Sequence, residues 1–189
     1  AGVCGITHKT LKVKKYYGIN SDIIYPPASS LLDEKKITFP SDSNYFLVVS
    51  RLVPYKKVGL VVKAATDLNL PLIVIGKGVE KKNLKMVAGK SVRFKEYVSD
   101  DILRGYLKNA KALIYPSEED FGIGMVEAQI HGTPVIAFIK GAAKEIIIPG
   151  KTGELYEKQS VESLKRELKN FKKDKYNEKD CITNGMRFS

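Results

Sequence analysis

Short apolar runs alternate with longer amphipathic segments through most of this chain. Runs too short for a helix predict buried strands at 45–52, 71–78, 92–94, 112–117, 132–138 and 151–156. Helical patterns follow them at 56–69, 80–87, 99 onward, 125–131, 160–171 and 176–187. The alternation predicts an α/β fold, with a Rossmann-like parallel sheet of about six strands and helices on both faces.

The first part of the chain has a different pattern. Residues 11–17 predict a basic helix ended by Gly18, and residues 22–27, which end in two prolines, predict a short extended segment. Residues 29–44 are polar and contain Pro40, so they predict a linker or surface loop.

The richest stretch for chemistry is SEEDFGIGMVEAQIHGTPVIAF, residues 117–138. A buried strand ends at Pro116, and Gly122 and Gly124 then allow the backbone to approach a ligand closely. A helix over 125–131 leaves free N–H groups near 122–125, at the carboxyl edge of the sheet. Helix N-termini at that edge attract phosphate, so the stretch predicts an anion site.

Two carboxylates accompany the anion site. Glu119 lies in the loop and Glu127, eight positions later, in the first turn of the predicted helix. A carboxylate can accept hydrogen bonds from two sugar hydroxyls, so the pair suits a phosphorylated polyhydroxyl ligand. The alternative is structural: Glu127 complements the helix dipole and Glu119 is a solvated loop acid.

Two cations end the strand at 45–52. Arg51 and Lys56 can converge on a phosphate at the carboxyl edge, or they can be ordinary solvated charges. The next strand ends in Gly76 and Gly78, a spacing that also closes many strand-to-helix turns. Gly141, after the strand at 132–138, marks a further turn. The N–H groups of Gly141 and Ala142 can donate to a ligand, or the turn can have only a structural role.

With these residues in place, the chain resembles the retaining glycosyltransferases of family 4, also called group 1, which have the two-domain GT-B fold. Glu119 and Glu127 match the family's glutamates separated by seven residues, and GTPVIAF with Gly141 and Glu145 matches the continuation. The variant EDFG is most similar to members that use nucleotide-linked mannose or a related hexose.

The resemblance implies roles for these residues. The donor is a GDP- or UDP-linked sugar, used as a substrate without a metal or other cofactor. Glu127 holds the ribose hydroxyls, and Glu119 contacts the sugar ring and stabilises charge at the anomeric carbon. The remaining donor-binding residues are Arg51, Lys56, Gly76, Gly78, Val98, Phe121, Gly122, Ile123, Gly124 and Met125.

The resemblance also implies a domain division. Residues 1–28 are expected to end an N-terminal acceptor domain and its linker, and residues 29–189 to form the C-terminal nucleotide-sugar-binding domain without its final crossover helix. The parent protein is then a hexosyltransferase that acts on a glycan or lipid-linked acceptor. The isolated chain is expected to be inactive.

Composition and charge refine the partners. The net charge of +11, from 32 Lys and Arg residues, favours anionic partners such as a nucleoside diphosphate or an anionic membrane surface. Aromatic residues are not interleaved with basic ones, so nucleic acid is not expected. No apolar run is long enough for a membrane span, and Cys4 and Cys181 lack metal-ligand spacing. We therefore expect a cytoplasmic protein with peripheral membrane contact.

Two other functions stay open on these observations. A nucleotide-sugar epimerase or hydrolase can have the same architecture, because the fold does not fix the reaction. A non-catalytic module that binds nucleotide sugars is the other. His8 and His131 are poor catalytic candidates, and His131 is expected to end a helix.

Overall fold

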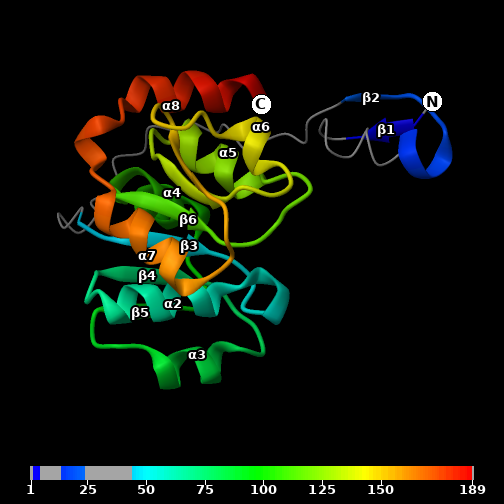
Figure 1. Ribbon diagram of the computed structural model, residues 1–189. Helices are drawn as coiled ribbons and strands as arrows, with labels where there is room; N and C mark the ends of the chain where they lie inside the picture. Colours follow the sequence, from blue (N-terminus) through cyan, green and yellow to red (C-terminus); the bar gives the residue numbers. More distant parts are fainter. Residues whose placement is uncertain (1, 5–13, 24–43, 189) are drawn as a thin grey trace.

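The computed structural model describes residues 2–4, 14–23 and 44–188. Its main body contains a six-stranded parallel sheet with the order β5-β4-β3-β6-β7-β8 (Figure 1). The strands are β3 (Phe46–Val49), β4 (Leu72–Ile75), β5 (Val92–Lys95), β6 (Ala112–Tyr115), β7 (Val135–Phe138) and β8 (Gly153–Tyr156). The predicted Rossmann-like α/β sheet is therefore confirmed.

The strand order reverses between β3 and β6. From β3 the chain builds outward through β4 to β5, and β6, β7 and β8 extend the sheet from the other side of β3. In open parallel sheets, a crevice forms beyond the carboxyl ends of the two strands at such a reversal. The loops that leave β3 and β6 therefore meet at one place, although they are far apart in sequence.

Helices cover both faces because successive strand residues point to opposite sides. Phe46 and Val48 pack on one face with α2 (Val58–Asp67), α3 (Lys81–Val87) and α7 (Val161–Asn170). Leu47 packs on the other with α4 (Asp100–Asn109), α5 (Ile123–Ile130) and α6 (Ala143–Ile146), and α8 (Glu178–Gly185) lies against α5. Burial on both faces explains why β3, β4, β6 and β7 are apolar throughout rather than alternating.

Two helices beside the predicted anion site begin elsewhere than predicted. The helix expected from residue 56 starts at Val58, after a 3-10 turn at Pro54–Lys56, because Lys57 has a left-handed backbone (φ 55°). The helix expected over 125–131 begins two residues earlier, at Ile123. Its N-cap is the left-handed Gly122, whose carbonyl accepts from the amides of Met125 and Val126 at 2.8 and 3.2 Å.

A buried amide network fixes α5 from behind. The Asn184 side chain in α8 donates to the side-chain oxygen Oε1 of Gln129 at 2.6 Å and to the main-chain oxygen of Ile146 at 2.7 Å. Gln129 itself donates to the same Ile146 oxygen at 3.2 Å. Because these groups are buried and hydrogen-bonded, they lock α8, α5 and the end of α6 in one arrangement.

The N-terminal part is described only in pieces. β1 (Gly2–Cys4) pairs in parallel with β2 (Ser21–Ile23), and residues 14–17 are helical up to Gly18. The rest of the predicted 11–17 helix, most of the extended segment at 22–27 and nearly all of the polar segment at 29–44 lie outside the described residues. Within the described part of the chain, no helix has the length and hydropathy needed to cross a membrane.

Candidate functional site

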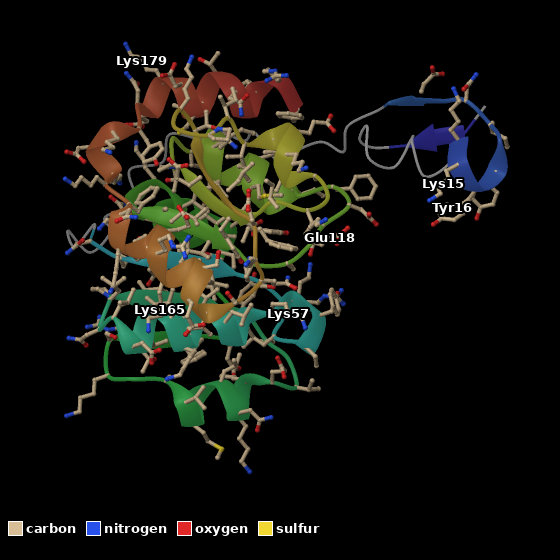
Figure 2. All side chains as sticks on the ribbon, viewed as in Figure 1. Lys15, Tyr16, Lys57, Glu118, Lys165 and Lys179 are labelled. Carbon is tan, nitrogen blue, oxygen red and sulfur yellow. The ribbon has the colours of Figure 1, made fainter. Side chains whose placement is uncertain are left out.

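Side chains from the loops after β3 and β6 meet at the reversal of strand order. The Lys56 ammonium forms an ion pair with the Glu119 carboxylate, 63 residues away in sequence. Ser117 donates to the same carboxylate oxygen at 3.0 Å. The side chains of Lys56 and Glu119 are only 14% and 20% exposed, so solvent screens this pair less than a surface pair. Figure 2 labels their chain neighbours, Lys57 and Glu118.

Tyr55 holds the two predicted cations side by side, a role that sequence reasoning missed. Its hydroxyl accepts a hydrogen bond from Arg51 Nη2 at 2.6 Å, and Lys56 Nζ lies 5.3 Å from the centre of its ring. The guanidinium keeps most of its five N–H donors for other acceptors. The position of Tyr55 between the two cations in the RLVPYK segment was the available signal.

A cavity of about 270 Å³ opens beside these groups. It joins the predicted cations to the predicted glutamate in α5 and to the start of that helix. Its lining comprises Val49, Ser50, Arg51, Lys56, Leu103, Leu107, Leu113, Tyr115, Ile123, Gly124 and Glu127. One wall of the cavity is thus positively charged and another carries a carboxylate, as a ligand with both phosphate and hydroxyl groups requires.

Glu127 does not occupy the first helical turn, contrary to the prediction. Because α5 starts at Ile123, Glu127 is its fifth residue, and the first turn carries no acidic side chain. Burial, with Asp100 nearby, raises the pKa of the Glu127 carboxyl above its ordinary value. No hydrogen bond joins its carboxylate to another described residue. A role in complementing the helix dipole is therefore disfavoured, and the carboxylate stays available as an acceptor.

The start of α5 offers fewer amides than predicted. The Met125 N–H is already bonded to the Gly122 carbonyl at 2.8 Å, and the Met125 side chain is buried. The N–H groups of Ile123 and Gly124 have no acceptor among the described residues, and both residues line the cavity. The helix start thus presents two N–H groups at the site, with the positive end of its dipole behind them.

Gly141, after β7, fixes the backbone of Glu119. It is left-handed (φ 68°), and a Cβ atom there would lie 2.2 Å from the Glu119 carbonyl oxygen. The Ala142 amide donates to that oxygen at 2.8 Å. The Ala142 amide was expected either to contact a ligand or to be structural. It is structural, because its N–H already donates to the Glu119 carbonyl oxygen.

Besides Gly122 and Met125, four predicted donor-binding residues lie outside the cavity lining. Gly76 and Gly78 pack against the backbone of the loop after β3, where a Cβ at Gly78 would lie 2.1 Å from the Leu52 carbonyl oxygen. Val98 and Phe121 are partly buried against the core. The glycines thus support the loop that carries Arg51, and direct contact of these four residues with a ligand stays a prediction.

Tyr115 is a second residue that sequence reasoning missed. It ends β6 and lines the cavity, with its ring under the start of α5. Burial, followed by the charges of Glu119 and Glu127, raises the pKa of the Tyr115 phenol, so it stays protonated as a hydrogen-bond donor. Its place as the last residue of an apolar strand before Pro116 was the only sequence signal.

His131 lies where the sequence predicted, at the C-cap of α5. Burial, followed by Arg104 and Lys108, lowers the pKa of its imidazole, which favours the neutral form. Among the described residues, no group of three or more His, Cys, Asp or Glu side chains is arranged to hold a metal ion. Function without a metal stays a prediction.

Replacing Glu127 with glutamine should stabilise the free protein in a pH-dependent way. Above the raised folded-state pKa, the carboxyl is ionised in both the folded and the unfolded chain, and its burial costs free energy. Below its unfolded pKa it is neutral in both, and the cost disappears. We expect Glu127→Gln to raise the melting temperature by on the order of a few degrees at pH 8. Scanning calorimetry should show this gain shrinking as the pH falls; a gain that grows toward acid would contradict the assignment.

Comparison with known proteins gives a family match. A model of the family Glycosyl transferases group 1 matches residues 30–188. An uncharacterized glycosyltransferase of Methanocaldococcus jannaschii is 29% identical over 179 residues, covering 92% of this chain and 47% of that protein. A D-inositol 3-phosphate glycosyltransferase of Streptomyces avermitilis is 27% identical, covering 83% of this chain and 38% of that protein. The chain thus spans less than half the length of these relatives.

A solved structure agrees on the fold. Anabaena HepE, in complex with UDP and glucose, superimposes with a TM-score of 0.80 at 19% identity, covering 98% of this chain and 58% of that one. At this identity the likeness concerns the fold alone, which is the Rossmann-like domain of GT-B proteins.

Proposed function

This chain belongs to the group 1 glycosyl transferases, and we propose that it provides the donor half of a retaining family 4 active site. The proposed donor is a UDP- or GDP-linked hexose, and the EDFG segment favours mannose or a close relative. One observation carries the proposal. Lys56 and Glu119 pair across the reversal of strand order. They lie beside a cavity that is lined by Lys56 itself, Arg51, Glu127 and the start of α5.

In this proposal, the cations and the start of α5 bind the diphosphate of the donor. Lys56 has three N–H donors, so it can keep its bond to Glu119 and still donate to a phosphate oxygen. Arg51 and the free amides of Ile123 and Gly124 offer further donors around the same cavity. As the bond to the sugar breaks, these groups neutralise the charge that grows on the departing diphosphate. We propose that no metal ion is needed for this step.

The two carboxylates serve different parts of the donor in this proposal. Glu127, acceptor-only while ionised, binds the two ribose hydroxyls. Glu119 binds hydroxyls of the sugar ring and stabilises the positive charge that develops at the anomeric carbon. Its pairing with Lys56 fits this role, because the lysine then stands between the carboxylate and the phosphates and limits their mutual repulsion.

Calorimetric titration with nucleoside diphosphates and their sugars tests the donor site. Glu119→Gln should change the affinity for UDP or GDP less than about threefold but remove the gain in affinity that the sugar provides. Glu127→Ala, which deletes two hydrogen bonds to a charged acceptor, should weaken both ligands about 10- to 100-fold. Equal losses for the diphosphate and the sugar nucleotide in Glu119→Gln would show that Glu119 contacts the nucleotide instead.

The same titration separates other functions. An epimerase or hydrolase would consume the sugar nucleotide without an acceptor, which chromatography of the titrated solution detects. A non-catalytic binding module would bind the donor, but the full-length protein that contains it would transfer no sugar to an acceptor. Binding to any oligonucleotide with a steep salt dependence would instead indicate a nucleic-acid protein.

The remaining parts of the proposal concern the whole protein. We propose that a glycan or lipid-linked acceptor binds to an N-terminal domain that ends within residues 1–28, and that residues 29–189 alone do not transfer sugar. A cytoplasmic location, at the surface of an anionic membrane, completes the proposal. Transfer by the 189-residue chain with an added acceptor would overturn the division of labour.

A further inference from the structure

A second cavity, larger than the one at the donor site, lies away from that site. It measures about 500 Å³ and lies against β4, β5 and α4. Its apolar wall includes Ile73 and two tyrosines, Tyr45 and Tyr106, whose rings meet edge to face at 6.2 Å. It does not border the crevice at the carboxyl ends of β3 and β6, so the proposed sugar-nucleotide function does not use it.

Three cations line this cavity without carboxylate partners. Lys90, Arg93 and Lys95 make no ion pair or side-chain hydrogen bond with any described residue, and Lys95 Nζ lies 5.6 Å above the centre of the Tyr106 ring. None of the described residues that line the cavity is acidic. Lys56 at the donor site and Lys63 in α2 differ in this respect, because each is paired with an acid. The cavity therefore complements an anion.

The surrounding surface is strongly basic. Residues 77–95 contain seven Lys or Arg residues and one Glu, a net charge of +6 against +11 for the whole chain. Lys81 is paired with Glu96 in the loop after β5. The remaining excess charge lies at one edge of the sheet, because β5 is the last strand on that side and α3 leads into it.

Large apolar side chains are exposed at the same edge. Met86 and Val87, which end α3, are 76% and 53% exposed, and three residues later the chain reaches Lys90 at the cavity. Three residues span at most about 11 Å. Figure 1 shows α3 outside α2, at the opposite end of the domain from α8. Exposed apolar groups next to unpaired cations are the combination that binds lipid interfaces.

We propose that this edge, formed by α3, residues 88–91 and β5 and here called the β5 edge, binds the surface of a membrane that contains anionic phospholipid. A lipid phosphate sits at the mouth of the cavity, against Lys90, Arg93 and Lys95. Met86 and Val87 enter the headgroup region beside it. The site is separate from the donor crevice and would leave that crevice open to a sugar nucleotide.

Co-sedimentation of the 189-residue chain with vesicles tests the site. The chain should pellet with vesicles of phosphatidylcholine containing about 30% phosphatidylglycerol and stay in solution with pure phosphatidylcholine. The double variant Arg93→Glu/Lys95→Glu should bind at least about tenfold more weakly, because each basic residue near an anionic membrane surface contributes roughly a fivefold factor and two are reversed. Both side chains are outward-facing on an edge strand, and circular dichroism should show an unchanged fold.

A matched variant removes the same charge elsewhere. Lys175→Glu/Lys179→Glu changes two exposed lysines near or in α8, and Figure 2 shows Lys179 at the far end of the domain from α3. This variant should keep most of the vesicle binding, and Met86→Ser/Val87→Ser should reduce it.

Three results would overturn the proposal. One is equal loss in both charge-reversal variants, which would mean that net charge alone drives binding. Another is equal binding to neutral vesicles. The third is displacement by millimolar glycerol 3-phosphate, which would identify a soluble phosphate ligand instead. The β5 edge deepens the membrane location proposed above. None of these results affects the nucleotide titrations, so the donor-site proposal succeeds or fails separately.

Discussion

Replacing Lys56 with methionine is expected to lower the affinity for nucleoside diphosphates about 10- to 100-fold, because a charge-assisted hydrogen bond to phosphate is lost. A second effect acts in the same direction. Lys56 is the partner of the Glu119 carboxylate, so its removal leaves an uncompensated negative charge beside the phosphates. Titration calorimetry at moderate salt measures the loss, and methionine keeps most of the side-chain volume.

The partner variant separates these two effects. In Lys56→Met/Glu119→Gln, the repulsive carboxylate is gone, so part of the affinity should return, and the two changes should not be additive. Lys57→Met is the matched control, because Lys57 is exposed, adjacent in sequence and absent from the cavity lining. A loss in Lys57→Met as large as in Lys56→Met would show that only general positive charge matters.

Replacing Gly141 with alanine is expected to destabilise the fold by about 3 kcal/mol and to disturb the site. The left-handed backbone accounts for about 1–2 kcal/mol of this. The rest arises because a Cβ 2.2 Å from the Glu119 carbonyl oxygen forces the two loops apart. Glu119 then loses its position relative to Lys56, so the sugar-dependent part of donor binding should fall with stability. Urea unfolding and titration with a sugar nucleotide measure the two effects.

Gly150→Ala isolates the backbone contribution. Gly150 is also left-handed, with φ 74°, but a Cβ there would meet no atom within 4 Å. We expect a cost of only about 1 kcal/mol and unchanged ligand binding. If the two alanine variants lost the same stability, the close approach of Gly141 to Glu119 would contribute nothing.

The strands were predictable because burial on both faces leaves a simple trace. A parallel strand such as β3 or β7 is covered by helices on each side, so its residues are apolar without alternation, and a run of that length is too short for a helix. Arg51 and Glu119 were predicted to lie at the carboxyl edge of the sheet, and each does follow the end of a strand. Any chain with this alternation must bring such loops to one edge.

Helix starts were less predictable because one backbone torsion decides them. Lys57 is left-handed, which no residue preference indicates, and α2 therefore begins at Val58. Gly122 is left-handed as well, so α5 begins at Ile123 and Glu127 falls in its second turn. These shifts change which groups can contact a ligand. The Met125 N–H donates to the Gly122 carbonyl, and Glu127 is a buried acceptor rather than a partner of the helix dipole.

The sequence by itself determined the alternating α/β architecture and which residue types stand at the ends of strands, because hydrophobic periodicity and glycine positions are local properties. Only the tertiary structure decided which of those residues meet. Strand order joins Lys56 to Glu119 across 63 residues. It also leaves Lys90, Arg93 and Lys95, in or just before the edge strand β5, without an acidic partner among the described residues. Ion pairing and cavity formation depend on distances between segments remote in the chain, which no local pattern contains.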